Sequence, residues 1–260
     1  MLLLLSPAKK LDEVSPAPAV WQQLKATTPQ FLEESQLLIN QLSRCHYLDL
    51  MELMKISRPL AELNLQRYLT FAPPFTVAQQ RQALRLFKGD VYSGLAVADF
   101  SVADLTFAQQ HLRILSGLYG LLRPLDLMHP YRLEMGTPLA TARGRNLYQF
   151  WGSSLSVAID EILQQQENPL LLNLASAEYF KAVKPDEIKA PLVNVHFQQQ
   201  QGDGYRVIGI YAKRARGLMS RYIIKNRIDS LEAVKTFTDG GYHFNAALSN
   251  ERDLYFQREL

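Results

Sequence analysis

The pattern of apolar and polar residues divides the first half of the chain into one short strand followed by helices. The run of four leucines at 2–5 predicts a buried opening strand. Apolar residues at mixed spacings of three and four predict a helix over 29–44, and the pattern over 48–71 predicts two helices that separate near Ser57 and Pro59. Capping patterns and apolar spacing predict further helices over 76–88, over 101–115 ahead of a turn at 117–120, and over 153–166.

Strand patterns are concentrated in the second half of the chain. Short apolar runs predict strands at 170–174, 192–197, 205–211, 242–244 and 254–257. Helices and strands interleave without a regular βαβ rhythm, which favours an α+β protein with a largely antiparallel or mixed central sheet surrounded by helices. Because no change of composition marks a linker, we expect residues 1–260 to form a single domain.

Positive charge is concentrated in one segment. Residues 205–227 contain seven Lys or Arg and no acid, whereas the whole chain has a net charge of +3, so the other residues sum to −4. On a helix, Arg214, Arg221 and Lys225 would lie within about 40° of each other and form one cationic stripe, with Lys213 and Arg216 in the same run. Such a cluster is typical of a surface that binds a phosphate-bearing partner; an ordinary solvated helix face is the alternative.

Two strand ends supply further candidate cations. Lys9 and Lys10 directly follow the opening strand and should emerge at an end of the sheet, where ligands commonly bind. Lys9 is the first phosphate candidate there, although the glycines of a phosphate-binding loop are missing. Lys181 follows the strand predicted at 170–174 and would extend the basic surface.

The segment 111–136 combines glycine, aromatic and ionic residues. Gly117 and Gly120 lie in a turn that is similar to the turn of a helix-hairpin-helix motif, in which backbone N–H groups hold a DNA phosphate; a plain helix terminus is the alternative. Further along, paired charges and a phenol lie beside Pro124 and Pro130, at Arg123, Asp126, Tyr131, Arg132 and Glu134. They indicate either a polar pocket with Arg forks for an anion or purely structural ion pairs.

Other classes of site lack their patterns. Cys45 is the single cysteine, which excludes an internal disulfide framework and favours the cytoplasm. The five histidines are scattered, so no metal site is expected, and no dinucleotide fingerprint indicates a cofactor. The opening apolar run is too short for a signal peptide or a membrane-spanning helix, so we expect no membrane partner.

Several ordered sequence blocks resemble one known family, the YaaA family of peroxide-stress proteins. The blocks are SPAKKLD at 6–12, FKGDVYSGL at 87–95, LSGLYGLLRPLDLMHPYRLEMG at 115–136, LYQFWG at 147–152, NLASAEYFK at 173–181 and YAKRARGLMSRYIIKNR at 211–227. The resemblance implies a cytoplasmic, bacterial-type protein with an unusual mixed fold, a positively charged cleft, a helix-hairpin-helix-like element and DNA binding. It also implies protection against oxidation by limiting free intracellular iron under hydrogen peroxide. The family usually has Thr where this chain has Lys10.

Two functional hypotheses follow. The first is a DNA-binding protein of low sequence specificity that binds double-stranded or junction DNA, because no recognition helix with base-reading residues is evident. Its phosphate-binding candidates are Lys9, Lys10, Arg132, Lys181, Lys213, Arg214, Arg216, Arg221 and Lys225, with Gly117 and Gly120 in the hairpin turn.

The second hypothesis is an enzyme that acts on a nucleotide or another small phosphorylated ligand held by the same cations. Its catalytic groups would come from Asp126, Tyr131, Glu134, Glu178 and Lys181. A deep pocket lined by Lys9, Arg132, Asn173 and Lys213 would favour the enzyme, and an open groove would favour DNA. Because no iron cage of carboxylates and histidines is evident, an effect on iron would be indirect.

Overall fold

A central β-sheet organises the protein. The computed structural model describes residues 1–259, whose buried apolar side chains include one cluster that runs from Met1 to Phe256. Within these residues, eight strands form a sheet in the order β11-β12-β9-β8-β1-β5-β6, with β10 paired to β9. The strands are β1 (Leu2–Leu5), β5 (Leu112–Ser116), β6 (Gly120–Leu122), β8 (Leu171–Asn173), β9 (Leu192–Gln201), β10 (Gly204–Arg206), β11 (His243–Phe244) and β12 (Asp253–Arg258).

The middle of this sheet is parallel and its margins are antiparallel. β1 pairs in parallel with β5 and β8, and β9 pairs in parallel with β8 and β12. β6, β10 and β11 pair antiparallel with their neighbours. All four leucines of β1 are buried because this strand lies between two others and is covered on both faces, which explains its uninterrupted apolar run. The α+β class and the mixed sheet are confirmed, with parallel pairs at the centre.

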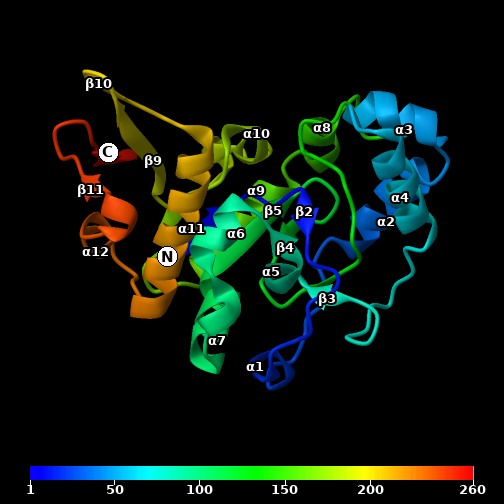
Figure 1. Cartoon of the computed structure of the whole chain (residues 1–260), viewed down its shortest axis with the longest axis horizontal. Coiled ribbons are helices and arrows are strands. Elements are labelled where there is room, and N and C mark those ends of the chain that lie inside the picture. The colour runs from blue at the N-terminus through cyan, green and yellow to red at the C-terminus, as the bar shows by residue number, and fades with distance from the viewer. Residues whose placement is uncertain (260) are drawn as a thin grey trace.

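Helices and two small ladders surround the sheet (Figure 1). The helices are α1 (Ala19–Gln22), α2 (Leu32–Leu42), α3 (Tyr47–Met54), α4 (Arg58–Leu69), α5 (Ala83–Leu86), α6 (Asp90–Leu95), α7 (Val102–His111), α8 (Leu147–Trp151), α9 (Ser154–Gln164), α10 (Ala177–Phe180), α11 (Gly209–Asn226) and α12 (Leu231–Lys235). Short 3₁₀ turns cover Val97–Asp99, Pro185–Glu187 and Asp239–Gly241. The small ladders pair β2 (Lys10–Leu11) with β4 (Phe87–Lys88) and β3 (Arg81–Gln82) with β7 (Leu127–Met128).

The two sides of the molecule are built from different parts of the chain. In Figure 1, α2, α3, α4 and α8 lie together on one side, and β9–β12 with α12 lie on the other. The short elements β2, β4 and α6 lie between them, beside α11. The functional candidates on β2 and α11 are therefore brought to the middle of the molecule.

Close backbone contact fixes α11 against α6. A Cβ atom on Gly217 would lie 1.8 Å from the carbonyl oxygen of Val91, and one on Gly94 would lie 2.2 Å from the carbonyl oxygen of Arg214. No side chain fits in either place, so the two helices cross with their backbones nearly touching. The glycines at these positions are required by this approach.

Several predicted boundaries are confirmed. The helices α3 and α4 separate near Ser57, where Lys55 adopts a left-handed conformation (φ 52°) that ends α3. Ser101 and Asp104 form a capping box: the Ser101 hydroxyl accepts from the Asp104 N–H, and the Asp104 carboxylate accepts from the Ser101 N–H. The opening strand is confirmed as well.

Three predicted segments were wrong, and in the first two strand pairing between distant residues overrides local helix signals. The helix over 76–88 is replaced by β3, α5 and β4, whose strands pair with β7 and β2. The helix that should reach residue 115 ends at His111, because 112–116 pairs with β1 as β5. The strand at 205–211 ends at Arg206, and α11 begins at Gly209.

Among residues 1–259, no helix combines the length and the apolar character that crossing a membrane requires.

Candidate functional site: a pocket at the carboxyl ends of β1 and β8

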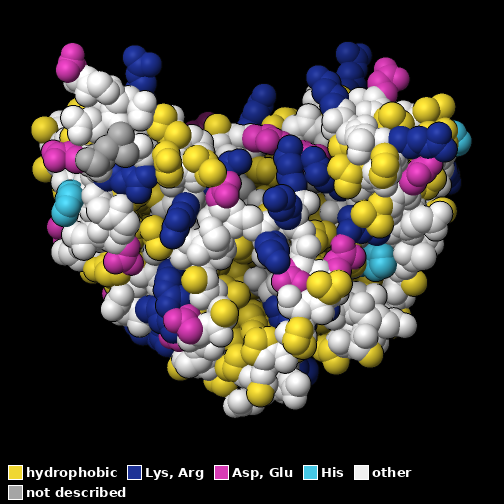
Figure 2. All heavy atoms as spheres, viewed as in Figure 1, with side chains coloured by type: hydrophobic (Ala, Val, Ile, Leu, Met, Phe, Trp, Pro, Cys, Tyr) yellow, Lys and Arg dark blue, Asp and Glu magenta, His cyan; other side chains and the backbone are white. Residues whose placement is uncertain are grey.

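A pocket of about 300 Å³ lies where the central parallel strands end. The segments that follow β1 and β8 lie at one edge of the sheet because these strands are parallel, and this is the edge where ligands bind in many parallel sheets. The charged residues that line the pocket are Lys9, Lys10, Lys88, Asp90, Arg132, Glu134, Glu178, Lys213 and Arg216. Figure 2 shows Lys and Arg side chains gathered around the hollow at the centre of this face, over the region of β2, α10 and α11 in Figure 1.

One wall carries a paired carboxylate. Glu134 Oε1 lies 3.0 Å from Lys9 Nζ and 2.8 Å from both Nε and a terminal nitrogen of Arg132. The Tyr68 hydroxyl donates a hydrogen bond to the carbonyl oxygen of Arg132, which anchors this segment to α4. Glu134 therefore neutralises part of the charge of Lys9 and Arg132, and it holds Arg132 in one position.

Another part of the lining is supplied by α11. Lys213 and Arg216 are three residues apart, so they lie on the same side of the helix. Lys213 is exposed, whereas Arg216 is half-buried. Burial lowers the pKa of the Arg216 guanidinium, and no acid or hydrogen bond contributes to that shift.

A third group of cations comes from the β2–β4 ladder. Lys10 and Lys88 are directly opposite each other in this antiparallel pair, and both are exposed. Lys88 Nζ lies 3.6 Å from Asp12 Oδ2, whose carboxylate also accepts hydrogen bonds from Ser15. Like charges placed directly opposite each other in a ladder are destabilising unless an anion lies between them.

Buried phenols form the inner surface of the pocket. Tyr92 donates to the carbonyl oxygen of Ser6 (3.0 Å), and the Tyr131 hydroxyl lies 2.6 Å from Ser116 Oγ. Tyr179, on α10, is buried and also lines the pocket. Burial raises the pKa of all three phenols, so they are neutral at physiological pH. They offer apolar ring surface and hydroxyl groups, and none is a base.

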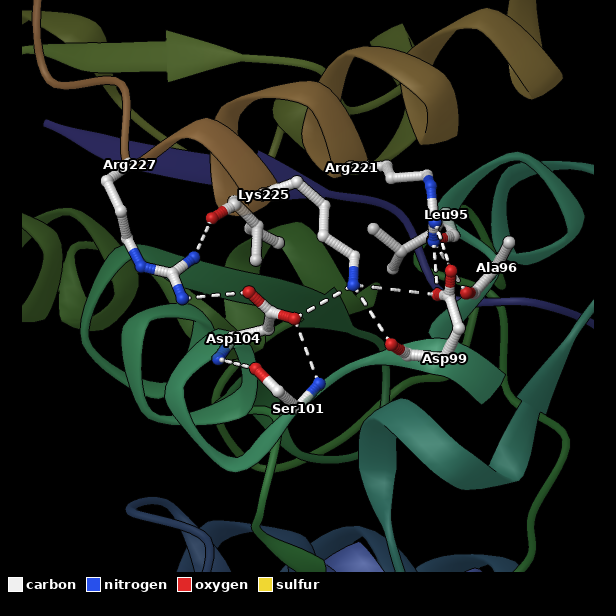
Figure 3. Close-up of polar contacts among 9 residues, drawn as sticks. Leu95, Ala96, Asp99, Ser101, Asp104, Arg221, Lys225 and Arg227 are labelled. Atoms are coloured by element: carbon white, nitrogen blue, oxygen red, sulfur yellow. Dashed lines mark hydrogen bonds and ion pairs between the residues drawn. The ribbon is translucent and has the colours of Figure 1, made fainter.

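The predicted cationic stripe on α11 is largely neutralised by acids from another part of the chain (Figure 3). Arg221 binds Asp99 with two hydrogen bonds of 2.7 and 2.5 Å. Lys225 Nζ lies 2.9 Å from Asp104 Oδ2, and Arg227 lies 2.8 Å from Asp104 Oδ1. Asp99 and Asp104 flank the start of α7, which lies beside α11. Of the predicted stripe, Arg214 is exposed and has no carboxylate partner among residues 1–259, and it is not part of the pocket lining.

Three other candidates lie outside the pocket lining. Lys181 is exposed, and its ammonium lies 4.9 Å from the centre of the Tyr148 ring. Asn173 accepts from the Ala175 N–H and donates to Asn194. Asp126 is buried and binds Arg123. The structure thus brings together Lys9, Lys10, Arg132, Lys213 and Arg216, and of the proposed catalytic groups it brings Tyr131, Glu134 and Glu178 to the same pocket.

The helix-hairpin-helix interpretation was wrong. The turn that contains Gly117 and Gly120 connects β5 to β6, which are antiparallel strands, and both glycines are buried. The Trp151 indole donates to the carbonyl oxygen of Gly117, and a Cβ atom on Gly120 (φ 68°) would lie 2.7 Å from the same ring. The glycines therefore lie in a buried β-turn packed against Trp151, and not between two helices.

Sequence reasoning missed part of the lining. Lys88 and Tyr92 lie within the block at 87–95 that contributes to the family resemblance, but the sequence pattern indicates no site residue in that block. The available signal was Lys88-Gly89-Asp90, a charged turn between apolar residues. Over residues 1–259, no group of three or more His, Cys, Asp or Glu is arranged to hold a metal ion.

The fold and the pocket define an α+β protein with a cation-lined pocket at one end of a mixed sheet. A family model described as peroxide stress protein YaaA matches residues 1–248, and the chain belongs to this family. Two similar proteins are UPF0246 proteins from Burkholderia vietnamiensis (48% identical) and Burkholderia cenocepacia (47% identical). Each alignment spans 262 residues and covers 100% of this chain and 99% of the relative.

Proposed function

We propose that this peroxide stress protein binds DNA in the cytoplasm through phosphate contacts of low sequence specificity, and that this binding limits oxidative damage linked to free iron. The single observation that supports DNA binding is the group of exposed cations that line the pocket. Lys10, Lys88 and Lys213 are exposed and line the same pocket, and Lys10 and Lys213 have no carboxylate partner within residues 1–259. Cations gathered in this way attract a polyanion and release its counterions.

The paired residues reduce the expected number of contacts. Arg221 and Lys225 are held by Asp99 and Asp104, and Lys9 is held by Glu134. Of the exposed candidates on β2 and α11, Lys10, Lys213 and Arg214 then remain without a carboxylate partner among residues 1–259. Neutralising about three phosphates gives a slope of about −3 for the logarithm of the binding constant against the logarithm of salt concentration.

A salt series tests this proposal. Duplex and four-way-junction DNA are titrated with the protein at several salt concentrations, and the Lys10→Gln/Lys213→Gln double variant should flatten the slope by about two. The matched control is Arg206→Gln, which removes an exposed arginine of β10 that is not part of the pocket lining. A slope unchanged in the double variant would remove this opening from the DNA interface.

A second candidate function is supported by the pocket itself. A volume of about 300 Å³ accepts a single nucleotide and is too small for a duplex. Tyr131, Glu134 and Glu178 line it together with the cations, so a small phosphorylated ligand would meet groups that can donate and accept hydrogen bonds. Titration of a mononucleotide into the protein tests this candidate, and the absence of binding at millimolar concentrations would exclude it.

A further inference from the structure

Arg216 is a guanidinium without a partner. Its Nε is completely buried and makes no hydrogen bond to any residue of the described chain, and no carboxylate of residues 1–259 forms an ion pair with it. Burial of a cation costs free energy unless hydrogen bonds and an opposite charge compensate for it. A cation that served only solubility would be exposed to water, whereas Arg216 is half-buried.

Two other arginines with a buried, unpaired Nε show the difference. Arg67 binds Asn64 and Glu13 through its terminal nitrogens, and Arg85 binds the carbonyl oxygen of Ser15. Both are therefore held by the protein itself. Arg216 has no such bond and lines the pocket, so its terminal nitrogens are available to a ligand, whereas its Nε is buried.

The rest of the pocket shows what kind of ligand fits. Tyr131 and Tyr179 contribute ring surface and neutral hydroxyls, as does Tyr92. Lys213 and the opposed pair Lys10 and Lys88 supply further positive charge. A ligand with a flat apolar body and a doubly charged anionic end complements both features, and a nucleoside monophosphate has this chemistry.

We propose that Arg216 anchors the phosphate of a single nucleotide in this pocket, with the body of the nucleotide against the tyrosines. The inference rests on the second function proposed above and adds the anchoring residue and the chemical class of the ligand. The planar fork of arginine suits a phosphate because two parallel N–H groups donate to two oxygens. The nucleotide has one of two sources: it is free in solution, or it is turned out of a DNA strand.

The test compares ligands with and without phosphate. Deoxyadenosine 5′-monophosphate and deoxyadenosine are titrated calorimetrically into the full chain and into Arg216→Met, Arg216→Lys and the control Arg206→Met. Losing charge-assisted hydrogen bonds should weaken binding of the monophosphate about 30-fold in Arg216→Met and less in Arg216→Lys. Arg206→Met should leave this affinity within about twofold, since Arg206 is an exposed residue of β10 that is not part of the lining.

Stability supplies an independent readout. An arginine that is unpaired until ligand binds should not support the fold, so the urea midpoint of Arg216→Met should equal or exceed that of the wild type. A structural arginine would give a lower midpoint. If Arg216→Met does not fold, Arg216 is structural and the inference fails. In that case Arg216→Lys should bind the monophosphate with the affinity of the wild type, which would confirm that the guanidinium does not anchor the phosphate.

A duplex carrying one mismatched 2-aminopurine distinguishes the two sources. An increase in fluorescence that Arg216→Met abolishes supports a nucleotide turned out of DNA, and an unchanged signal together with Arg216-dependent monophosphate binding supports the free nucleotide. The inference is overturned if Arg216→Met changes neither signal. Arg216-dependent binding of the monophosphate without salt-dependent DNA binding would refute the DNA proposal and leave this inference standing.

Discussion

Asp104 offers the sharpest test of how the charge of α11 is held. The change is Asp104→Asn, which keeps an oxygen able to accept from the Ser101 N–H and so preserves the cap, but removes the charge that faces Lys225 and Arg227. The Asp104 side chain is 8% exposed, and those of Lys225 and Arg227 are 29% and 38% exposed. Loss of the carboxylate therefore leaves two cations that water reaches only in part.

The magnitude follows from these contacts. A hydrogen bond to a charged group contributes about 1.5–3 kcal/mol. Two such bonds are lost, but water compensates the partly exposed cations, and Lys225 keeps Asp99 at 3.8 Å. The free energy of unfolding should therefore fall by about 2 kcal/mol. Urea unfolding at about pH 7 measures it, with Asp203→Asn as the control, because Asp203 is exposed in a turn and should change stability by less than about 0.5 kcal/mol.

The difference in the free energy of unfolding between the wild type and Asp104→Asn should also depend on pH. Hydrogen bonds from Lys225, Ser101 and Arg227 hold the pKa of Asp104 well below its ordinary value of 3.8, although burial acts in the opposite direction. A lowered pKa in the folded state means that the carboxylate stabilises the fold above the ordinary pKa and that this contribution is lost as the pH falls. This difference in the free energy of unfolding should be constant from about pH 7 to about pH 5 and should shrink below about pH 4. The reasoning would be refuted if the difference grew on acidification, or if Asp104→Asn lost no more free energy of unfolding than Asp203→Asn.

Three further changes have defined outcomes. Gly217→Ala should lower the free energy of unfolding by about 2 kcal/mol or more, since its Cβ would overlap Val91 O, whereas Gly209→Ala in the same helix has no atom within 4 Å and should be neutral or stabilising in urea unfolding. Gly120→Ala should destabilise by about 2 kcal/mol or more, because it adds a Cβ at φ 68° against Trp151; a thermal shift below about 2 °C would contradict this. Arg221→Gln should leave the salt slope of DNA binding unchanged, since Asp99 already neutralises Arg221, and a slope flattened by about one would instead place Arg221 at a phosphate.

The sequence predicted those elements whose signals are local. The leucines of β1, the separation of α3 from α4 and the capping box of α7 all depend on neighbouring residues, and each was identified. The strands β3, β4 and β5 were missed because their pairing partners are distant in the chain: Arg81 pairs with Met128, and Leu112 pairs with Leu3. Local helix propensity cannot reveal such pairs.

The same limit applies to the site. Helical spacing correctly placed Arg221 and Lys225 on one side of α11, but their acidic partners Asp99 and Asp104 precede them by more than a hundred residues. An acid-free segment therefore appeared more positive than it is in the folded protein. The unpaired state of Arg216 was equally hidden, because it depends on which side chains fail to reach it in three dimensions.

The glycine contact between α6 and α11 constrains how the pocket accommodates a ligand. Residues 89–92, at and just before the start of α6, line the pocket on one side, and Lys213 and Arg216 of α11 line the adjoining side. Because the backbones of α6 and α11 are in contact at Gly94 and Gly217, these two sides of the pocket form one rigid unit, and the distance between them is fixed. Elsewhere in the lining, Glu178 accepts a hydrogen bond from the Gly136 N–H at 3.0 Å and couples the segment after Tyr131 to α10. If a ligand binds, we therefore expect the pocket to change its size through this segment and α10, while the cations of α11 keep their positions relative to α6.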